Sequence, residues 1–545
     1  MKAKSTNLAV VLSALREKRI TILAWFFAGA IAMYFEAIAI AAELRDYPGG
    51  PQALAKSIMP TIEGLRIIRW PADRLDTLGG YLSYHNVVLF NFFLGLFAAI
   101  QGARSIRHLE ENKDIDFYLS SGLSRAKLIY LRSSAYFISQ IIISLGLGLG
   151  TAFALASSDE PNTYGAIITL LAGGICIFPF FGLGLLFSQF ISTSRTASGA
   201  TSIIVTLLYL INNIADKYSW LTWGKYLSPF YYANLSRPVI PGYGTHYWSW
   251  VFMISIGIFF IFLSSYIFNR RDIGAVYFEN SKRKFKSKKT NKYIPKTLIG
   301  DMLWRQRIGL LAWAITTGIF IYVFISMMSD IVGIWEQFAF LQQFESSGLG
   351  KTAEEQYLAM VFEIMPPFIA GFIISQGSRW TSDLNQGRVQ MFLSTPITYS
   401  GLILRRFIAT LIGAEIIVIS SIVAVLIGSY RQNVSIENQA LFRVFVMSTL
   451  FALAFTSFNA ILVAVLKGKN ATTAISIYIG AAWMVGFMVP YLNWPNWVIR
   501  LSIFDAFGHP FVKWPENLSL FLILTLAIPG LILAMFISEK SSKVN

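Results

Sequence analysis

Long apolar stretches recur along the whole chain and are separated by short polar segments. A bilayer crossing takes about 20 consecutive apolar residues, and the chain holds about twelve stretches near that length. They lie at residues 20–42, 84–102, 128–156, 164–192, 197–215, 247–268, 308–330, 356–377, 403–429, 441–466, 471–491 and 518–538. The pattern predicts an all-α membrane protein with about twelve transmembrane helices.

The polar segments resemble each other at long range, which indicates an internal duplication. Leu15 with Arg19 recurs as Leu303 with Arg307, and Gln101-Gly102 recurs as Gln376-Gly377. Further matches follow at a constant offset of 274 residues: Leu119 to Ser124 with Leu393 to Thr398, Ala197-Ser198 with Ala471-Thr472, and Trp223 with Trp497. Because six spans separate the copies, we expect two parallel six-helix repeats related by an axis along the membrane normal. The transport pathway would lie between them.

Basic residues are distributed unevenly among the loops, and this predicts the orientation of the chain. Most of the 45 Lys and Arg residues fall in segments that share one side of the membrane when the N terminus is cytoplasmic. An even number of spans places the C terminus there too. The densest basic stretch, Arg270 to Arg307, lies between the sixth and seventh spans. We therefore divide the chain into a first six-helix half (1–268), a basic cytoplasmic linker (269–295) and a second six-helix half (296–545).

The overall composition narrows the classes of function. Of 545 residues, 55% are hydrophobic and 14% are charged, whereas soluble domains average about 25% charged, so little chain remains for a soluble catalytic domain. The net charge of +16 predicts contact with anionic membrane lipids and no nucleic-acid partner. One cysteine, Cys176, and four scattered histidines give no spacing typical of a metal site.

A short Gly-Lys-Thr sequence at residues 350–352 invites comparison with a phosphate-binding loop. That pattern requires a glycine at position 345, where this chain has Glu345, and it requires a cytoplasmic strand and helix on either side. The segment falls in an expected external loop. We therefore expect no ATPase site in this chain, and the chain itself is not expected to be an enzyme.

The cytoplasmic segments after the second and eighth spans share one order of residue types. Each has charged residues, then a short apolar helical stretch, then a turn closed by Gly or Pro, which suits a short helix on the membrane surface that docks a soluble partner. The candidate docking residues are Glu110, Glu111, Lys113, Asp116 and Arg125 in the first segment, and Asp383, Gly387, Arg388 and Pro396 in the second.

These segments resemble those of ABC-2 type permeases of ATP-binding-cassette exporters. The Gly-Arg at 387–388, the Leu-Ser-Thr-Pro-Ile-Thr turn at 393–398 and the Leu-Ser-Pro-Phe sequence at 227–230 are similar to landmarks of that class, and the duplicated length resembles its tetronasin and polyketide (polyether) antibiotic exporters. The first copy departs by having Lys113 and Gly122 where the second has Gly387 and Pro396.

The resemblance implies the partners and the activity. A separate cytoplasmic ABC ATPase, a homodimer that binds ATP and Mg²⁺, would dock on the two segments as coupling helices, and this chain would bind no cofactor itself. The cargo would be a hydrophobic or amphipathic small molecule, such as a polyketide or polyether antibiotic, exported across a bacterial cell membrane. Residues 1–19 and about 296–307 would be amphipathic connecting helices.

Other classes of function remain open. A proton-coupled secondary multidrug transporter of the major-facilitator kind also has twelve spans in parallel halves. Such transporters have a Gly-x-x-x-Asp-Arg-x-Gly-Arg loop after the second span and a short first external loop. This chain lacks that sequence after its second span, and its first external loop is long, at residues 43–83. An ABC exporter of lipid or peptide would share every feature above. A membrane-embedded enzyme would need His residues or paired carboxylates at membrane depth, and none is evident.

Polar residues inside the spans are candidates for the transport pathway. Ionisable groups within a bilayer are costly and are commonly functional. Glu36, Asn91, Glu363 and Glu415 meet this description. The alternative for each is an interhelical hydrogen bond or a position near the interface.

Overall fold

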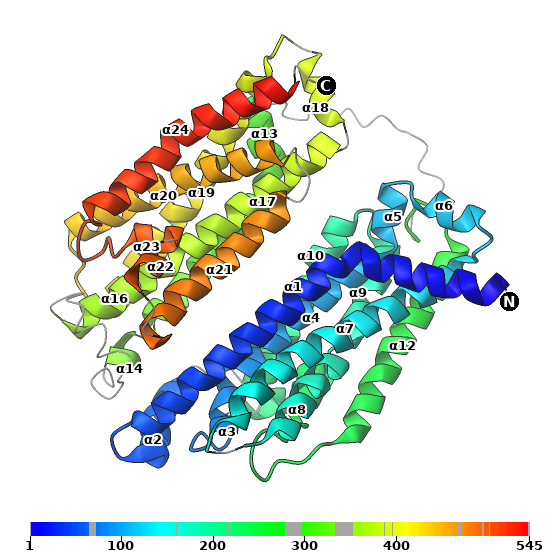
Figure 1. Ribbon diagram of the computed structural model, residues 1–545, viewed down its shortest axis with the longest axis horizontal. Coiled ribbons are helices and arrows are strands. Elements are labelled where there is room, and N and C mark those ends of the chain that lie inside the picture. The colour runs from blue at the N-terminus through cyan, green and yellow to red at the C-terminus, as the bar shows by residue number, and fades with distance from the viewer. Residues whose placement is uncertain are drawn as a thin grey trace. The chain divides into compact units, whose positions relative to one another are not determined.

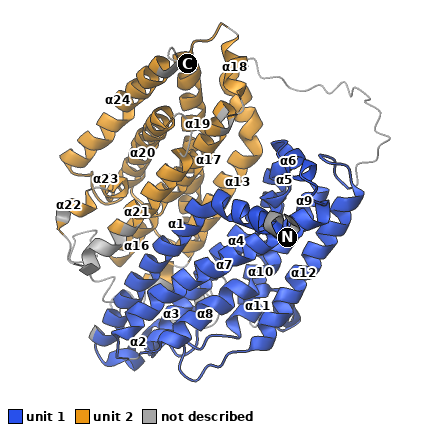
Figure 2. Ribbon diagram, turned by 45° about the vertical axis from the view of Figure 1, so that its right-hand side comes forward, with its two compact units in different colours: residues 1–288 blue, residues 289–545 orange. Residues whose placement is uncertain are grey.

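The computed structural model divides the chain into two compact units, residues 1–288 and 289–545 (Figure 2). The division falls within the predicted linker 269–295, of which residues 278–295 lie outside the described part of the chain. The described residues are 2–64, 72–159, 161–215, 218–277, 297–326, 328–332, 352–385, 387–394, 396–466, 471–492, 495–500 and 502–542.

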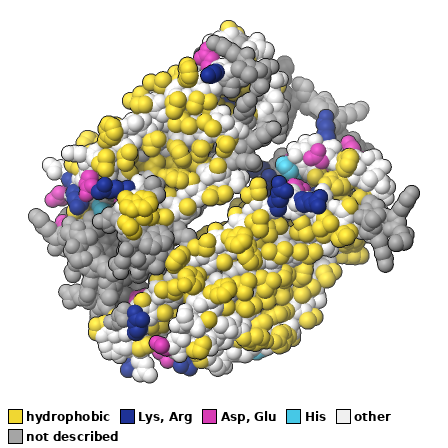
Figure 3. Space-filling model, viewed as in Figure 1, with side chains coloured by type: hydrophobic (Ala, Val, Ile, Leu, Met, Phe, Trp, Pro, Cys, Tyr) yellow, Lys and Arg dark blue, Asp and Glu magenta, His cyan; other side chains and the backbone are white. Residues whose placement is uncertain are grey.

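Every regular element in these described ranges is helical, and eleven helical stretches are long and apolar enough to cross a membrane. They are Asn7–Arg45, Leu78–Ser105, Arg125–Ala156, Thr163–Phe190, Ser194–Ile214, Tyr247–Arg270, Leu298–Ser326, Ala353–Thr381, Tyr399–Arg431, Asn438–Val465 and Asn517–Lys540. The remaining predicted span, 471–491, is helix α21, Ala471–Leu492. Hydrophobic side chains cover much of the visible helical surface, and charged ones gather toward the helix ends (Figure 3). The prediction of an all-α, multi-span membrane protein is confirmed.

Unit 1 follows the predicted order of spans, with two differences. The expected connecting helix 1–19 and the first span form one continuous helix, and the fourth span is broken where Pro179, which lacks a backbone N–H, begins a new helix. The elements of unit 1 are α1 Lys2–Asp46, α2 Gly50–Gly64, α3 Leu78–Leu82, the π-helix η2 Ser83–Val87, α4 Val88–Ser105, α5 Arg107–Glu111, α6 Ile115–Ser120, α7 Arg125–Ala156, α8 Thr163–Cys176, α9 Pro179–Phe190, α10 Ser194–Ile214, η3 Ser219–Leu227, α11 Pro229–Asn234 and α12 Tyr247–Arg270 (Figure 1).

Unit 2 contains a similar succession of helices. Its elements are α13 Leu298–Ser326, α14 Met328–Val332, α16 Ala353–Glu363, α17 Met365–Asn385, α18 Arg388–Leu393, α19 Tyr399–Arg431, α20 Asn438–Val465, α21, α22 Asn496–Ile499, α23 Ile503–Phe507 and α24 Asn517–Ser542. The eighth predicted span is divided between α16 and α17, just before Pro366-Pro367.

The same pairs of helices pack together in the two units. In unit 1, α1 packs on α7, α4 on α9, and α9 on α12. In unit 2, the helices at the matching positions pack as α13 on α19, α17 on α20, and α20 on α24. This order supports the predicted duplication, which stays a prediction.

Glycines allow the helices of unit 1 to approach closely, as small residues do in membrane proteins. A Cβ at Gly102 of α4 would lie 2.0 Å from the Phe181 carbonyl oxygen, and one at Gly184 of α9 would lie 2.2 Å from the Ala99 carbonyl oxygen. The α4–α9 crossing therefore depends on both glycines. It also fixes the end of α4, from which the first candidate coupling segment begins.

Candidate coupling segments and intramembrane polar residues

The first candidate coupling segment consists of the short helices α5 and α6, which follow α4. They are joined at Lys113, whose φ of 64° is left-handed, and the turn after α6 is made at Gly122 with a φ of 84°. Ser124 then caps α7 by accepting a hydrogen bond from the Lys127 backbone N–H. Two tight turns and a cap thus hold the segment as two separate short helices.

Glu110 lies at the buried centre of this segment, with 1% of its side chain exposed. Its carboxylate accepts two hydrogen bonds of 2.7 Å from the Arg271 guanidinium, one of 3.1 Å from the Gly274 N–H, and pairs with Arg107 at 3.0 Å. Arg271 follows α12, so the pairing joins α5 to the end of that helix. Glu110 therefore cannot contact a docked protein directly in this structure. Its role is to hold α5 against the end of α12.

Two neighbours of Glu110 attach the segment to further helices. Arg107 is 1% exposed and donates to the Ser188 carbonyl of α9 at 2.7 and 3.0 Å. Glu111 accepts hydrogen bonds of 2.6 Å from both the backbone N–H and the hydroxyl of Ser194, at the start of α10. A carboxylate is favourable at that position because the N-terminal N–H groups of a helix lack partners and carry partial positive charge.

Arg125 also faces the protein interior, whereas the outer surface of the segment belongs to other residues. Its guanidinium donates to the carbonyls of Arg271 at 2.7 Å and Phe268 at 3.3 Å, which ties α7 to the end of α12. Lys113 and Asp116 are exposed. Phe117, which follows Asp116 in α6, has 76% of its surface exposed.

The second candidate segment centres on α18 in unit 2. Gly387 precedes it with a left-handed φ of 69°, matching the conformation of Lys113 in unit 1. Asp383 pairs with Arg388 at 3.3 Å and with Arg406 of α19 at 2.5 Å. Pro396 is exposed in the turn before α19.

Reasoning from the sequence missed the most exposed apolar side chain on each segment. Met391 of α18 is 73% exposed, and it stands 274 residues after Phe117, the offset of the repeat. A single exposed apolar side chain is ordinary on a protein surface, so the distinguishing feature of this pair is that it recurs at the offset of the repeat. Each residue follows a polar one, Asp116 or Gln390, and begins a short apolar run, and the recurrence of this pattern at the repeat offset was the available signal.

Two of the intramembrane candidates lie in unit 1, in different surroundings. Glu36 of α1 accepts a hydrogen bond of 3.2 Å from the Asn86 amide. Asn86 belongs to the π-helix η2, a type of segment often found at functional sites. Asn91 is 3% exposed and packs against the backbone of Gly173 in α8.

The other two candidates lie in unit 2, each beside a polar partner. Glu363, at the end of α16, pairs with the His509 imidazole. Glu415 of α19 accepts a hydrogen bond of 3.1 Å from Thr449 of α20, and its second oxygen is buried without a hydrogen bond. No contact described in the structure joins the four candidates to one another, and their role in a pathway stays a prediction.

The structure offers no cluster of three or more His, Cys, Asp or Glu side chains that could hold a metal, among the residues it describes. The Gly-Lys-Thr loop of residues 345–352 lies outside the described residues except for Thr352, which caps α16. The geometry is therefore that of anchored surface helices and isolated intramembrane polar contacts.

Each half of the chain matches a known protein family. Residues 13–273 match the ABC-2 family transporter protein, and residues 299–537 match the multidrug efflux system permease Rv1217c, C-terminal domain. A search of curated proteins finds no match. The multi-span helical fold agrees with both families. The chain is a multi-pass membrane protein whose first half is similar to the ABC-2 family transporter protein and whose second half is similar to the C-terminal domain of a multidrug efflux system permease.

Proposed function

We propose that this chain is the membrane subunit of an ATP-driven exporter and that α6 and α18 are the docking points of a separate cytoplasmic ATPase. The observation that carries the proposal is the pair Phe117 and Met391, two exposed apolar side chains on short, anchored surface helices at the offset of the repeat. Such a side chain gains free energy when a partner pocket buries it, about 1.5–3 kcal/mol for a full burial. ATP and Mg²⁺ would bind to the ATPase dimer.

The anchoring contacts supply a route for coupling. Closure of an ATPase dimer would displace α6. The buried contact of Glu110 and the part-buried contacts of Glu111 and Arg125 would pass that displacement to α12, α10 and α7. In unit 2 the pair of Asp383 with Arg406 would connect α17 to α19. Under the proposed duplication the two units would rock about an axis along the membrane normal.

The proposed cargo is a hydrophobic or amphipathic small molecule such as a polyketide or polyether antibiotic. The match of unit 2 to a multidrug efflux permease domain supports a drug-like cargo. The intramembrane acids support it as well, because Glu36, Glu363 and Glu415 each already contact a polar partner. Such a lining poorly matches a highly charged solute.

Docking is tested by combining Phe117→Ala with Met391→Ala and isolating the protein from membranes with its ATPase. We expect the double variant to recover much less ATPase than the wild type and to lose resistance to exported compounds. Trp220→Ala is a matched control, because Trp220 is 71% exposed but belongs to η3 rather than to a coupling segment. Wild-type ATPase recovery by the double variant would overturn the docking assignment.

The cargo class is tested with a susceptibility panel of hydrophobic antibiotics on cells with and without the gene. We expect the gene to raise the inhibitory concentration of some compounds. Loss of resistance when the proton gradient alone is collapsed, with ATP maintained, would favour a secondary transporter. Absence of any resistance phenotype would favour export of lipid or peptide.

A further inference from the structure

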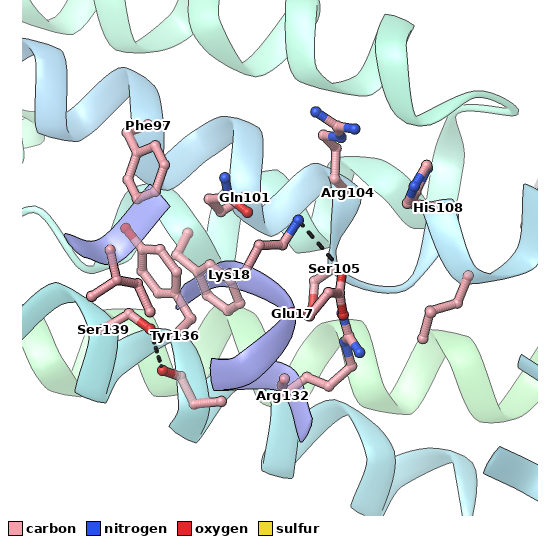
Figure 4. A pocket seen from close by; sticks show the side chains of 15 residues that line it. Glu17, Lys18, Phe97, Gln101, Arg104, Ser105, His108, Arg132, Tyr136 and Ser139 are labelled. Carbon is pink, nitrogen blue, oxygen red and sulfur yellow. Dashed lines mark hydrogen bonds and ion pairs between the residues drawn. The ribbon is translucent and has the colours of Figure 1, made fainter. Parts of the chain in front are cut away.

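A pocket opens in unit 1 between α1, α4, α5 and α7, at the end of the unit that the charge bias predicts to be cytoplasmic (Figure 4). It is separate from the exposed surface of α6. One part of its lining is basic, with Lys18, Arg104, Arg132 and His108, and another part is apolar, with Ile22, Phe97, Tyr136 and Phe181. The pocket is therefore amphipathic.

The basic part of the pocket carries more positive than negative charge. Three cations, Lys18, Arg104 and Arg132, face a single carboxylate, that of Glu17. Glu17 pairs with Arg132 at 3.1 Å and with Lys18 at 3.5 Å, and Figure 4 shows these three side chains gathered on one side, with Arg104 on the other. One carboxylate cannot neutralise three cations, so the pocket is short of negative charge.

Arg132 gives an independent indication that the pocket binds a ligand, because some of its donor atoms have no partner in the protein. It is 7% exposed, yet its Nε and Nη1 atoms are buried without a hydrogen-bond partner. Burying a charged donor without a partner is costly. A ligand oxygen at this position would satisfy the guanidinium in the geometry that carboxylates and phosphates share.

The state of His108 agrees with a positive environment. Burial lowers the pKa of His108 below its usual value of 6.5, and the neighbouring cations Arg104 and Lys18 lower it further, against smaller opposite effects of Glu111 and Glu17. His108 is thus neutral at pH 7. An anion bound in the pocket would raise its pKa, because it would stabilise the imidazolium.

The apolar wall of the pocket favours an amphiphilic ligand over a free anion. The Tyr136 ring stacks on Phe181 with 4.2 Å between centroids, and Phe97 lies 6.3 Å from the Tyr136 ring. These rings extend from the basic end into the span region of α4, α7 and α9. A free phosphate would use only the basic part, whereas a lipid would use both, with its headgroup at the interface where basic pockets between helices bind such groups.

We propose that this pocket binds the phosphate headgroup of an anionic phospholipid of the inner leaflet, with Lys18, Arg104 and Arg132 as its cationic contacts. The residues at the repeat offsets in unit 2 are paired differently. Arg305 stands at the position of Glu17 and pairs with Asp301, and Arg406, at the position of Arg132, pairs with Asp383. Gln306 replaces Lys18 and accepts a hydrogen bond from Arg379. Two of these arginines thus have a carboxylate each, whereas three cations share Glu17 in unit 1.

Native mass spectrometry of the full chain in neutral detergent, with added phosphatidylglycerol or phosphatidylcholine, tests the proposal. The variant Lys18→Gln with Arg104→Gln leaves the Arg132–Glu17 pair intact. Since a cation near a headgroup contributes about fivefold in affinity, we expect the double variant to weaken phosphatidylglycerol binding about thirty-fold. Arg379→Gln, at the position of Arg104 in unit 2, is the matched control and should bind as the wild type does.

Three results would overturn the proposal. Equal binding of phosphatidylcholine and phosphatidylglycerol would show that the headgroup charge is not recognised. Inorganic phosphate that binds as tightly as the lipid would show a simple anion site. Unchanged phosphatidylglycerol binding in a folded double variant, judged by the wild-type melting temperature, would place lipid elsewhere. A large upward shift of the His108 pKa on adding phosphatidylglycerol, measured by NMR, would support the proposal.

Discussion

Replacing Glu110 by Gln should loosen the first candidate coupling segment while leaving its outer surface unchanged. The substitution keeps the shape of the side chain but removes the negative charge that lies between Arg107 and Arg271. One oxygen can still accept from Arg271 or from the Gly274 N–H. The new amide group, however, must point its hydrogens toward a guanidinium.

The expected loss of stability follows from the burial of the Glu110 carboxylate. Glu110 and both arginines are 1–2% exposed, and the carboxylate makes three hydrogen bonds of 2.7–3.1 Å beside the Arg107 pair. Breaking a buried ion pair on one side costs about 3–5 kcal/mol, because a charge is left uncompensated. Arg271 retains Gln189 and the Ala275 carbonyl as partners, so we expect about 3 kcal/mol.

A double-mutant cycle measures this value. Glu110→Gln, Arg271→Gln and their combination would be compared by thermal unfolding in detergent, with hydrogen exchange of α5 and α6 as a local readout. The two losses should be strongly non-additive, because the second substitution removes the charge that the first left unpaired. Asp116→Asn, on the exposed side of α6, should change stability by less than about 0.5 kcal/mol. A loss below about 1 kcal/mol for Glu110→Gln, with additive effects in the cycle, would refute the reasoning.

Three further outcomes are expected. Lys113→Gly should stabilise unit 1 and Gly387→Ala should destabilise unit 2, each by about 1 kcal/mol, because both positions have a left-handed φ; melting temperatures that move in the same direction would contradict this. Gly184→Val should cost about 3 kcal/mol or prevent folding, whereas Gly199→Ala, with open space at its Cβ, should be tolerated; equal yields of monodisperse protein would argue against the α4–α9 contact. Glu415→Gln should change resistance to some compounds more than others if this carboxylate faces cargo, and an equal loss across the panel that follows protein level would assign it to packing.

The helical spans were predictable because they depend on local apolar runs, but the breaks within them were not recognised. Pro179 interrupts the fourth span and Pro366-Pro367 follow the break in the eighth. Each proline removes a backbone donor, and this is readable from the sequence. A run that is apolar throughout nevertheless looks like one continuous span, because hydropathy does not record where the helix axis is interrupted.

The candidate coupling residues show what a sequence alone leaves undetermined. Glu110, Glu111 and Asp116 are all acids in one short segment, yet the first is buried, the second contacts the start of α10 and the third is exposed. The partner of Glu110, Arg271, lies 161 residues away in what the sequence suggested was a basic linker. Burial by a distant part of the chain is not encoded in local charge or periodicity.

The two candidate coupling segments are anchored with different strength, and this bears on how each unit would respond to a docked partner under the proposed function. In unit 1 the contacts of Glu110 and Arg107 are excluded from water, so α5 and the ends of α9 and α12 are expected to move together. In unit 2, Arg388 is 58% exposed where it pairs with Asp383, and an exposed pair of this kind contributes about 0–1 kcal/mol. A displacement of α18 would therefore reach the membrane helices mainly through the less exposed pair of Asp383 with Arg406, which joins α17 to α19. The closure of a docked partner would thus act, through α5, on the ends of α9 and α12 in the first unit, and on α17 and α19 in the second.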